Sequence, residues 1–288
     1  MKVISIAPRG YCKGVIKAVN AVKKANEDPM VMKPIYILGY IVHNKYVIKE
    51  LKEMGIITLD DRFKSRLELI DNIKSGTVVL SAHGTDPKVK EKLIDRKIPF
   101  IDATCVDVET TFSLIKDYSN KGYYIFYIGK HNHPESIAAI SLSDNISLVE
   151  DTNDIPKGIK MPIFVTNQTT FSKFEIKDLI DKIIKQYPNT VVSEEICNAT
   201  SLRQSAIIKY NKGVDLCYIV GDPRSNNTRN LAIVSETITK TKTIQIETVK
   251  DICPKDLKNV SLVSVSSGAS TPNHLTQEVI DYLKNYKS

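Results

Sequence analysis

The sequence contains no tryptophan, and aromatic residues make up only 7% of its 288 positions. Proteins that hold single-stranded nucleic acid use platforms of stacking rings beside basic residues. The net charge of +7 comes from Lys and Arg that alternate with Asp and Glu, as in KDLIDKIIK, which is typical of a solvated helix face. We therefore expect no nucleic acid partner, and only a weak attraction for small anions.

Long apolar runs are also missing. No run approaches the roughly 20 residues that a membrane-spanning helix needs, and the first residues, MKVISIAPRG, predict a strand instead of a signal peptide. These absences predict a protein that does not enter the membrane, and we expect it to be cytoplasmic and monomeric.

Cysteine is scarce, and the cysteines do not occur in closely spaced pairs. The five cysteines are an odd number spread over the chain, which argues against a secreted disulfide framework. No C-x-x-C knuckle occurs, so a structural zinc site is not expected. A Walker G-x-x-x-x-G-K-[ST] sequence is missing too, so ATP binding is not indicated.

One unit recurs about nine times along the chain: a short β-branched run, a polar turn and an amphipathic helical stretch. Strands that alternate with helices predict parallel α/β sheets. Ligands of such sheets lie beyond the carboxyl ends of strands, where helix N-termini offer free N–H groups. The polar motifs of this sequence fall at those strand ends.

The spacing of three cysteines indicates a long-period repeat. Cys12 and Cys105 are 93 positions apart, and Cys105 and Cys197 are 92 apart. Polar motifs follow each cysteine at similar distances in every third of the chain. We predict three pseudo-repeated α/β lobes with mainly parallel sheets, arranged as a trefoil around a central site. The predicted lobes are 13–104, 105–194 and 195–288, with the N-terminal strand 1–12 joined to the third.

The same three cysteines are candidate metal ligands. Each stands after a predicted strand and before a predicted helix, where a helix N-terminus favours the thiolate form. Three thiolates from three lobes suit a [4Fe-4S] cluster with one iron left without a protein ligand. A small buried hydrophobe is the competing interpretation for any single cysteine. Cys217 and Cys253 fit no repeat position, and we interpret them as structural.

Hydroxyl, amide and imidazole groups form a second candidate set, for a diphosphate held at helix N-termini. Each alone could be an ordinary loop residue, and Thr169 and Thr170 could simply cap a helix. The candidates are His43, His83, His133, Thr169, Thr170, Ser225, Asn226, Asn227 and Ser270.

The HNHPE segment, residues 131–135, is the densest candidate for catalysis. Glu135 could act as a general acid, because nearby negative charge would raise its pKa and keep a proton available. A helix-start charge is the competing interpretation. We expect His131 and His274 to be surface residues.

Taken together, PRGYCKGV, VHN, SAHG, DATC, HPE, TNQTT, EEICNAT, SNNT and SGAST resemble the 4-hydroxy-3-methylbut-2-enyl diphosphate reductases, the last enzymes of the non-mevalonate isoprenoid pathway. The resemblance runs from residue 7 to residue 273. It implies one [4Fe-4S] cluster per chain on Cys12, Cys105 and Cys197. It also implies reductive removal of the substrate hydroxyl by two electrons and two protons, to give isopentenyl and dimethylallyl diphosphates, with ferredoxin or flavodoxin as electron donor.

By the same resemblance, Glu135 delivers the proton and Thr169 contacts substrate. We predict Glu135, Thr169 and His133 as the catalytic residues, with Thr169 and His133 also binding substrate. The diphosphate-side donors would be His43, His83, His133, Ser225, Asn227 and Ser270. Asn226, Val106 and Asn198 depart from the commoner Ser, Pro and Tyr of similar sequences. Two other functions stay open from the residues alone: a cluster-dependent dehydratase that transfers no electrons, and a phosphate-ligand sensor whose cysteines are merely buried.

Overall fold

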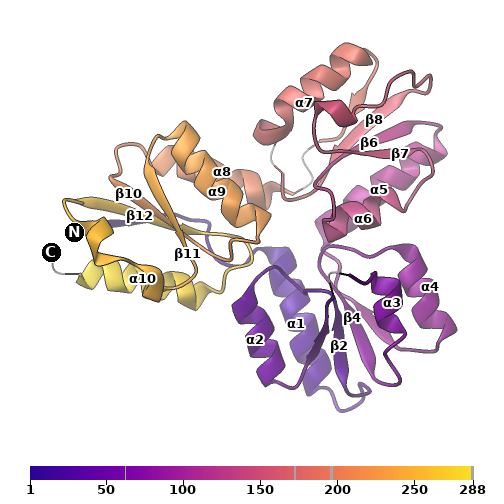
Figure 1. The fold of residues 1–288 in the computed structure, drawn as a ribbon, viewed down its shortest axis with the longest axis horizontal. Coiled ribbons are helices and arrows are strands. Elements are labelled where there is room, and N and C mark those ends of the chain that lie inside the picture. The colour runs from indigo at the N-terminus through magenta and orange to yellow at the C-terminus, as the bar shows by residue number, and fades with distance from the viewer. Residues whose placement is uncertain (62, 172, 195–196, 287–288) are drawn as a thin grey trace. The chain divides into compact units, whose positions relative to one another are not determined.

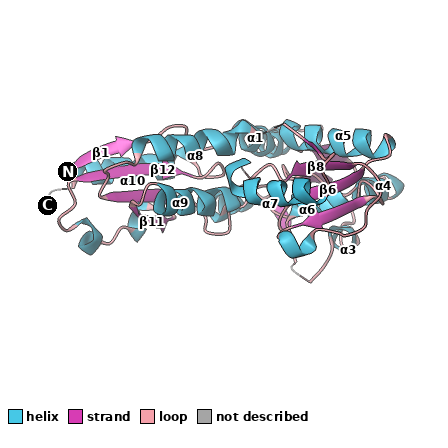
Figure 2. Cartoon of the chain, turned by 90° about the horizontal axis from the view of Figure 1, so that it is seen from above, coloured by secondary structure: helices cyan, strands magenta, loops and turns pink. Residues whose placement is uncertain are grey.

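The structure is a computed structural model that describes residues 1–61, 63–171, 173–194 and 197–286. Three parallel four-stranded sheets, each with its own helices, make up the described chain. Figure 1 shows the strands of each sheet side by side, and Figure 2 shows them, in magenta, flanked by cyan helices. The prediction of α/β lobes with parallel sheets is confirmed.

The first sheet has the strand order β3-β2-β4-β5. Its strands are short and apolar, and all four residues of β4 are buried. The strands are β2 (Ile35–Leu38), β3 (Ile57–Leu59), β4 (Thr77–Leu80) and β5 (Phe100–Asp102), and the helices in this part of the chain are α1 (Lys13–Glu27), α2 (Lys45–Glu53), α3 (Arg66–Ile70) and α4 (Pro87–Asp95).

The second sheet has the order β7-β6-β8-β9. Phe126 and Ile128 pack with α7 on one face, while Ile125 and Tyr127 pack with Ile115 of α5 on the other, as the period-2 alternation of a strand requires. The strands are β6 (Tyr124–Ile128), β7 (Ile146–Val149), β8 (Ile163–Asn167) and β9 (Val191–Val192), and the helices are α5 (Val106–Asn120), α6 (Pro134–Ile140), α7 (Lys173–Gln186) and the 3₁₀ turn η1 (Thr152–Asp154).

The third sheet has the order β1-β12-β10-β11, so the N-terminal strand is its edge. Lys2 to Ser5 pair in parallel with Leu262 to Val265. The strands are β1 (Lys2–Ser5), β10 (Leu216–Val220), β11 (Lys242–Ile246) and β12 (Leu262–Ser267), and the helices are α8 (Asn198–Tyr210), α9 (Asn226–Ile238), α10 (Asn273–Asn285) and the 3₁₀ turns η2 (Val249–Asp251) and η3 (Pro254–Leu257).

The three sheets share one topology. In the first two, the first strand along the chain lies between the second and the third, and the fourth pairs with the third. In the third sheet β10, β11 and β12 take the places of those first three strands. In the third sheet β1 takes the place of that fourth strand, so the repeat is circularly shifted along the sequence. The strands therefore repeat as the cysteine spacing predicts.

By its contacts the chain divides into two compact units. The first comprises residues 1–16, 42–49 and 198–288 and contains the third sheet, and the second comprises 17–41 and 50–197 and contains the other two sheets. The predicted lobe boundaries stay a prediction.

Candidate active site

Each sheet has a point where the strand order reverses: between β2 and β4, between β6 and β8, and between β10 and β12. In parallel α/β sheets, ligands bind beyond the carboxyl ends of the strands at such a point. The predicted substrate residues follow these strands in every sheet: His43 and His83 after β2 and β4, His133 and Thr169 after β6 and β8, and Ser225 and Ser270 after β10 and β12. The cysteines instead follow the fourth strands, β1, β5 and β9.

At the second sheet, Glu135 lies next to Thr169. Its side chain is 1% exposed, and three donors converge on its carboxylate. The Thr169 backbone N–H donates to Oε1 at 2.7 Å, Thr169 Oγ1 donates to Oε2 at 2.8 Å, and the Tyr127 hydroxyl donates to Oε1 at 3.1 Å. The structure thus brings together two of the predicted catalytic residues.

Burial raises the pKa of Glu135 to about 7, although the hydrogen bonds from Thr169 and Tyr127 pull the pKa in the opposite direction. A carboxyl group with this pKa exchanges a proton near neutral pH, which is the range that general acid catalysis needs. The neighbouring Tyr127 is fully buried, and its own pKa is raised by burial and by the charge of Glu135. Tyr127 therefore acts as a hydrogen-bond donor and not as a second acid.

His133 begins the helix that carries Glu135. It is the N-cap of α6, Pro134 follows at the first helical position, and His133 Nδ1 accepts the Glu135 N–H at 3.2 Å. A neutral imidazole that accepts at Nδ1 carries its proton on Nε2. His133 therefore has an Nε2–H that can donate to an anion. The His83 ring meets the His133 ring edge-on, with centroids 5.5 Å apart.

Gln168 ties Thr170 to the start of the HNHPE turn. The Gln168 side chain is fully buried. Its Nε2 donates to Thr170 Oγ1 at 2.5 Å, and its Oε1 accepts the Lys130 N–H at 3.1 Å and the Ser136 hydroxyl at 3.3 Å. This side chain fixes the TNQTT and HNHPE turns to each other. Ser172 of the TNQTTFS segment lies outside the described residues.

The turn that carries His83 is held by Arg66. The guanidinium donates to Gly84 O at 2.9 Å, Thr85 Oγ1 at 3.1 Å and Ser81 Oγ at 3.1 Å. Burial lowers the pKa of Arg66 to about 10, with Asp60 opposing this shift, and the side chain remains a cation. Gly84 has a left-handed φ of +79°, and a side chain here would collide with Phe112, so this turn requires glycine.

At the third sheet, three predicted donors lie close to one another within the first unit. Ser270 Oγ donates to the His43 carbonyl at 3.1 Å and lies 3.4 Å from Ser225 Oγ. Ser225 is also the N-cap of α9. The His43 backbone is thereby joined to Ser270 directly and to Ser225 through Ser270.

Asn226 and Asn227 differ in their surroundings. Asn227 is buried, its Oδ1 accepts the Ala269 N–H at 2.9 Å and its Nδ2 donates to Thr200 Oγ1 at 3.1 Å. It therefore anchors the loop that carries Ser270 to α8 and α9. Asn226 is half-buried and its Oδ1 accepts a hydrogen bond from Arg229.

Cys12, Cys105 and Cys197 are half-buried cysteines that form no disulfide, and each directly precedes a helix, α1, α5 and α8 respectively. The Cys12 N–H donates to Ala269 O at 3.0 Å, and the Cys105 N–H donates to Ala82 O at 3.0 Å. The thiol of Cys105, the N-cap of α5, makes no capping hydrogen bond. Cys217 is fully buried and Cys253 is exposed.

The departures from similar sequences beside two of the cysteines lie at exposed positions. Val106, beside Cys105, is exposed, as is Asn198 beside Cys197. Residues 195 and 196 of the EEIC motif lie outside the described residues. His131 and His274 are exposed, as expected.

Comparison with known proteins identifies the family. The profile of the LytB protein family matches residues 3–284. The 4-hydroxy-3-methylbut-2-enyl diphosphate reductase of Geobacillus thermodenitrificans is 45% identical over 289 residues, covering 99% of this chain and 91% of that protein. The chain belongs to the LytB family. The protein of the same name from Bacillus cytotoxicus is 44% identical over 290 residues, with the same coverage of 99% and 91%.

Solved structures of LytB relatives agree with the fold. The E-1-hydroxy-2-methyl-but-2-enyl-4-diphosphate reductase from Plasmodium falciparum has a TM-score of 0.91 at 30% identity, covering 99% of this chain and 88% of that chain. The (E)-4-hydroxy-3-methyl-but-2-enyl diphosphate reductase described as the terminal enzyme of the non-mevalonate pathway has a TM-score of 0.72 at 29% identity, covering 99% and 100%. The predicted family and fold class are confirmed.

Several residues that support the candidate site were not identified from the sequence. Tyr127 lies in the apolar run YIFYI and reads as a core residue. Arg66 stands outside the motifs that suggested function, and Gln168 lies inside TNQTT but was not chosen as a candidate.

Among the described residues, no helix has both the length and the apolar character that crossing a bilayer requires.

Proposed function

We propose that this member of the LytB family is a 4-hydroxy-3-methylbut-2-enyl diphosphate reductase. The observation that carries the proposal is the match over 99% of the chain to curated reductases at 44–45% identity. The reaction breaks the carbon–oxygen bond of the allylic alcohol. Two electrons and two protons enter, one proton leaves with the hydroxyl group as water, and the other adds to carbon to give isopentenyl or dimethylallyl diphosphate.

Cys12, Cys105 and Cys197 are the residues that would hold a [4Fe-4S] cluster. Their chemistry fits the group, because each is a half-buried cysteine outside any disulfide, directly before a helix, and cysteine sulfur is the usual ligand of such clusters. Once bound, such a cluster with three protein ligands supplies electrons and an open Lewis-acid position. Ferredoxin or flavodoxin is the class of donor that we propose for these electrons.

Glu135 is the group that we assign to proton delivery. Its pKa of about 7, which burial raises, leaves a substantial protonated fraction at neutral pH. Thr169 Oγ1 lies 2.8 Å from Oε2, so the hydroxyl can pass a proton or bond the substrate alcohol. His133 and the donors at the third sheet would bind the diphosphate through neutral N–H and O–H groups.

Reductant dependence tests this function against the dehydratase alternative. Anaerobically purified, cluster-loaded protein should convert the allylic diphosphate to the two isoprenoid diphosphates only when a reductant such as dithionite with methyl viologen is supplied. Equal conversion without any reductant would contradict the proposal, since a dehydratase needs no electrons. A folded, iron-free protein that binds phosphate ligands would instead support the sensor alternative.

A further inference from the structure

Asp222 is a buried carboxylate at the carboxyl end of β10, and the chemistry described above does not use it. It is 2% exposed. Arg224 donates three hydrogen bonds to its carboxylate: from Nε to Oδ1 at 3.0 Å, from NH2 to Oδ2 at 2.7 Å, and from the backbone N–H to Oδ1 at 2.9 Å. Burial pushes the pKa of Asp222 up, but these hydrogen bonds outweigh it, and the net pKa is lowered. Asp222 is therefore charged at neutral pH.

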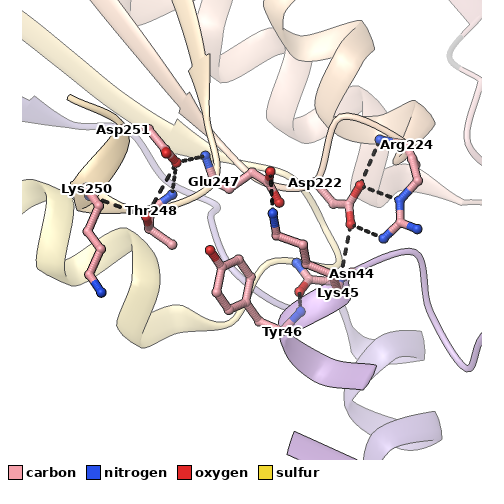
Figure 3. Close-up of polar contacts among 9 residues, drawn as sticks. All are labelled: Asn44, Lys45, Tyr46, Asp222, Arg224, Glu247, Thr248, Lys250 and Asp251. Atoms are coloured by element: carbon pink, nitrogen blue, oxygen red, sulfur yellow. Dashed lines mark hydrogen bonds and ion pairs between the residues drawn. The ribbon is translucent and has the colours of Figure 1, made fainter. Parts of the chain in front are cut away.

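A further partner of this carboxylate comes from a distant part of the sequence. The backbone N–H of Lys45 donates to Asp222 Oδ2 at 3.0 Å. Figure 3 shows Asp222 between Arg224 on one side and the Asn44–Lys45 turn on the other. Lys45 is two residues after His43. The same Asp222 accepts the Ser225 N–H at its backbone carbonyl, at 3.0 Å, so one residue contacts the turns that carry two of the proposed diphosphate donors.

The His43 turn has two further attachments to the carboxyl ends of the third-sheet strands. Lys45 Nζ pairs with Glu247 after β11 at 2.7 Å, and Ser270 after β12 donates to the His43 carbonyl. Asn44 is 1% exposed, and its Oδ1 accepts the Tyr46 and Val47 N–H groups at 3.0 and 3.3 Å, which starts α2 at this position. Tyr46 packs against the core of the third sheet.

These attachments differ in strength. The Lys45–Glu247 pair is partly exposed, and exposed pairs contribute little. The Ser270 hydrogen bond joins two neutral groups. The Asp222 bond is charge-assisted and its acceptor is buried, which makes it the strongest of the three polar links. Loss of Asp222 would leave the Lys45 N–H without its acceptor in a turn whose position sets that of His43.

We propose that Asp222 is a positioning residue that fixes the distance between His43 and Ser225, so that both donors are ready for the diphosphate before substrate binds. The inference rests on the proposed function, because it assigns these two residues to diphosphate binding. Preorganised donors lower the entropic cost of binding, so the effect belongs in KM. The rate of the chemical step at saturation does not depend on it.

Asp222→Ala tests this, with Asp215→Ala as a matched control. Asp215 stands just before the amino end of β10, and its Oδ2 accepts the Ser261 and Leu262 N–H groups at 2.9 and 2.8 Å. Both aspartates thus accept backbone N–H groups at the two ends of one strand. Only Asp222 reaches the His43 turn, so a general weakening of the third sheet would appear in both variants.

The first readout is amide hydrogen exchange of residues 42–49 in the cluster-loaded protein, which does not require turnover. Exchange of the Lys45 amide should become at least about tenfold faster in Asp222→Ala and should stay at the wild-type rate in Asp215→Ala. Asp222→Asn, which keeps one acceptor oxygen, should fall between wild type and Asp222→Ala. Unchanged exchange in Asp222→Ala would overturn the inference, even if wild-type protein reduces the allylic diphosphate.

The second readout is steady-state kinetics with equal iron content in all variants. Asp222→Ala should raise KM for the allylic diphosphate by about tenfold or more, with kcat within about twofold of wild type. The double variant Asp222→Ala/Arg224→Met should show the same raised KM, which excludes an effect of the released guanidinium. An unchanged KM in Asp222→Ala and in the double variant would overturn the positioning role. Wild-type protein that reduces no allylic diphosphate would instead refute the proposed function, and hydrogen exchange would still decide whether Asp222 holds the turn.

Discussion

Thr169 holds Glu135 with two hydrogen bonds at once, from its backbone N–H to Oε1 at 2.7 Å and from its hydroxyl to Oε2 at 2.8 Å. The two residues are 34 positions apart and follow neighbouring strands, β6 and β8. A buried carboxyl group is thereby fixed in orientation while its pKa is raised to about 7. The predictions on proton delivery follow from this pair.

Glu135→Gln should retain iron and substrate binding but lose turnover by about 100-fold or more, the usual contribution of a general acid. The amide keeps the shape of the side chain and cannot deliver the proton. Steady-state kinetics beside iron analysis measures both properties. Turnover within a few-fold of wild type would remove Glu135 from proton delivery.

Thr169→Val should shift the pH dependence of kcat/KM. The Thr169 hydroxyl lowers the pKa of Glu135, so its removal should raise that pKa further above about 7. Because the protonated form is the active one, the alkaline limb of the profile should move to higher pH. Thr169→Ser keeps the hydroxyl and should keep the wild-type limb. A limb that moves to lower pH in the valine variant would contradict this account.

Glu135 should also make the folded state less stable as pH rises. Its pKa is raised from 4.5 to about 7 on folding, so between these values the native state binds more protons than the unfolded state. The stabilisation present below pH 4.5 is therefore lost as pH rises toward 7, by up to about 3 kcal/mol. Urea unfolding at pH 5 and pH 8 should show a smaller pH difference in Glu135→Gln than in wild type. Glu91→Gln, at an exposed position of α4, should leave the wild-type difference intact.

Arg66→Met should destabilise the first sheet and loosen the His83 turn. The substitution leaves Gly84 O, Thr85 Oγ1 and Ser81 Oγ without the donor they share, which costs about 1–3 kcal/mol of unfolding free energy. Urea denaturation measures this loss. Lys64→Met, two residues away at an exposed position, should cost less than about 0.5 kcal/mol. Equal stability of the two variants would show that Arg66 does not support the turn.

All nine strands that the sequence predicted before polar motifs are present. The remaining strands, β3, β7 and β11, occupy the same edge position in the three sheets. They carry no motif, and most of their residues are only partly buried. The edge strands β1, β5 and β9 are no better buried, but a cysteine motif follows each of them. The missing motif is therefore what hid β3, β7 and β11 in the sequence.

The candidate site shows a similar division. Residues with distinctive chemistry, such as the cysteines, His133 and Glu135, could be chosen from motifs and spacing. Tyr127, Arg66 and Asp222 could not, because their roles depend on partners brought near by folding. Asp222 and the Lys45 N–H are 177 positions apart, and no local pattern relates them. Arg66 is the first residue of α3, and the rest of that helix and the whole of β4 separate it from the Ser81–Thr85 turn.

Iron and sulfide analysis with electron paramagnetic resonance, on anaerobically purified and reduced protein, tests the central claim most directly. Wild type and Cys253→Ser, which changes an exposed cysteine, should each contain close to four irons and four sulfides per chain, as a [4Fe-4S] cluster requires. Both should show the signal of a reduced cluster, while Cys105→Ser should lose most of its iron and the signal. A wild-type protein that folds without iron, or a Cys105→Ser variant that keeps a full cluster, would contradict the account.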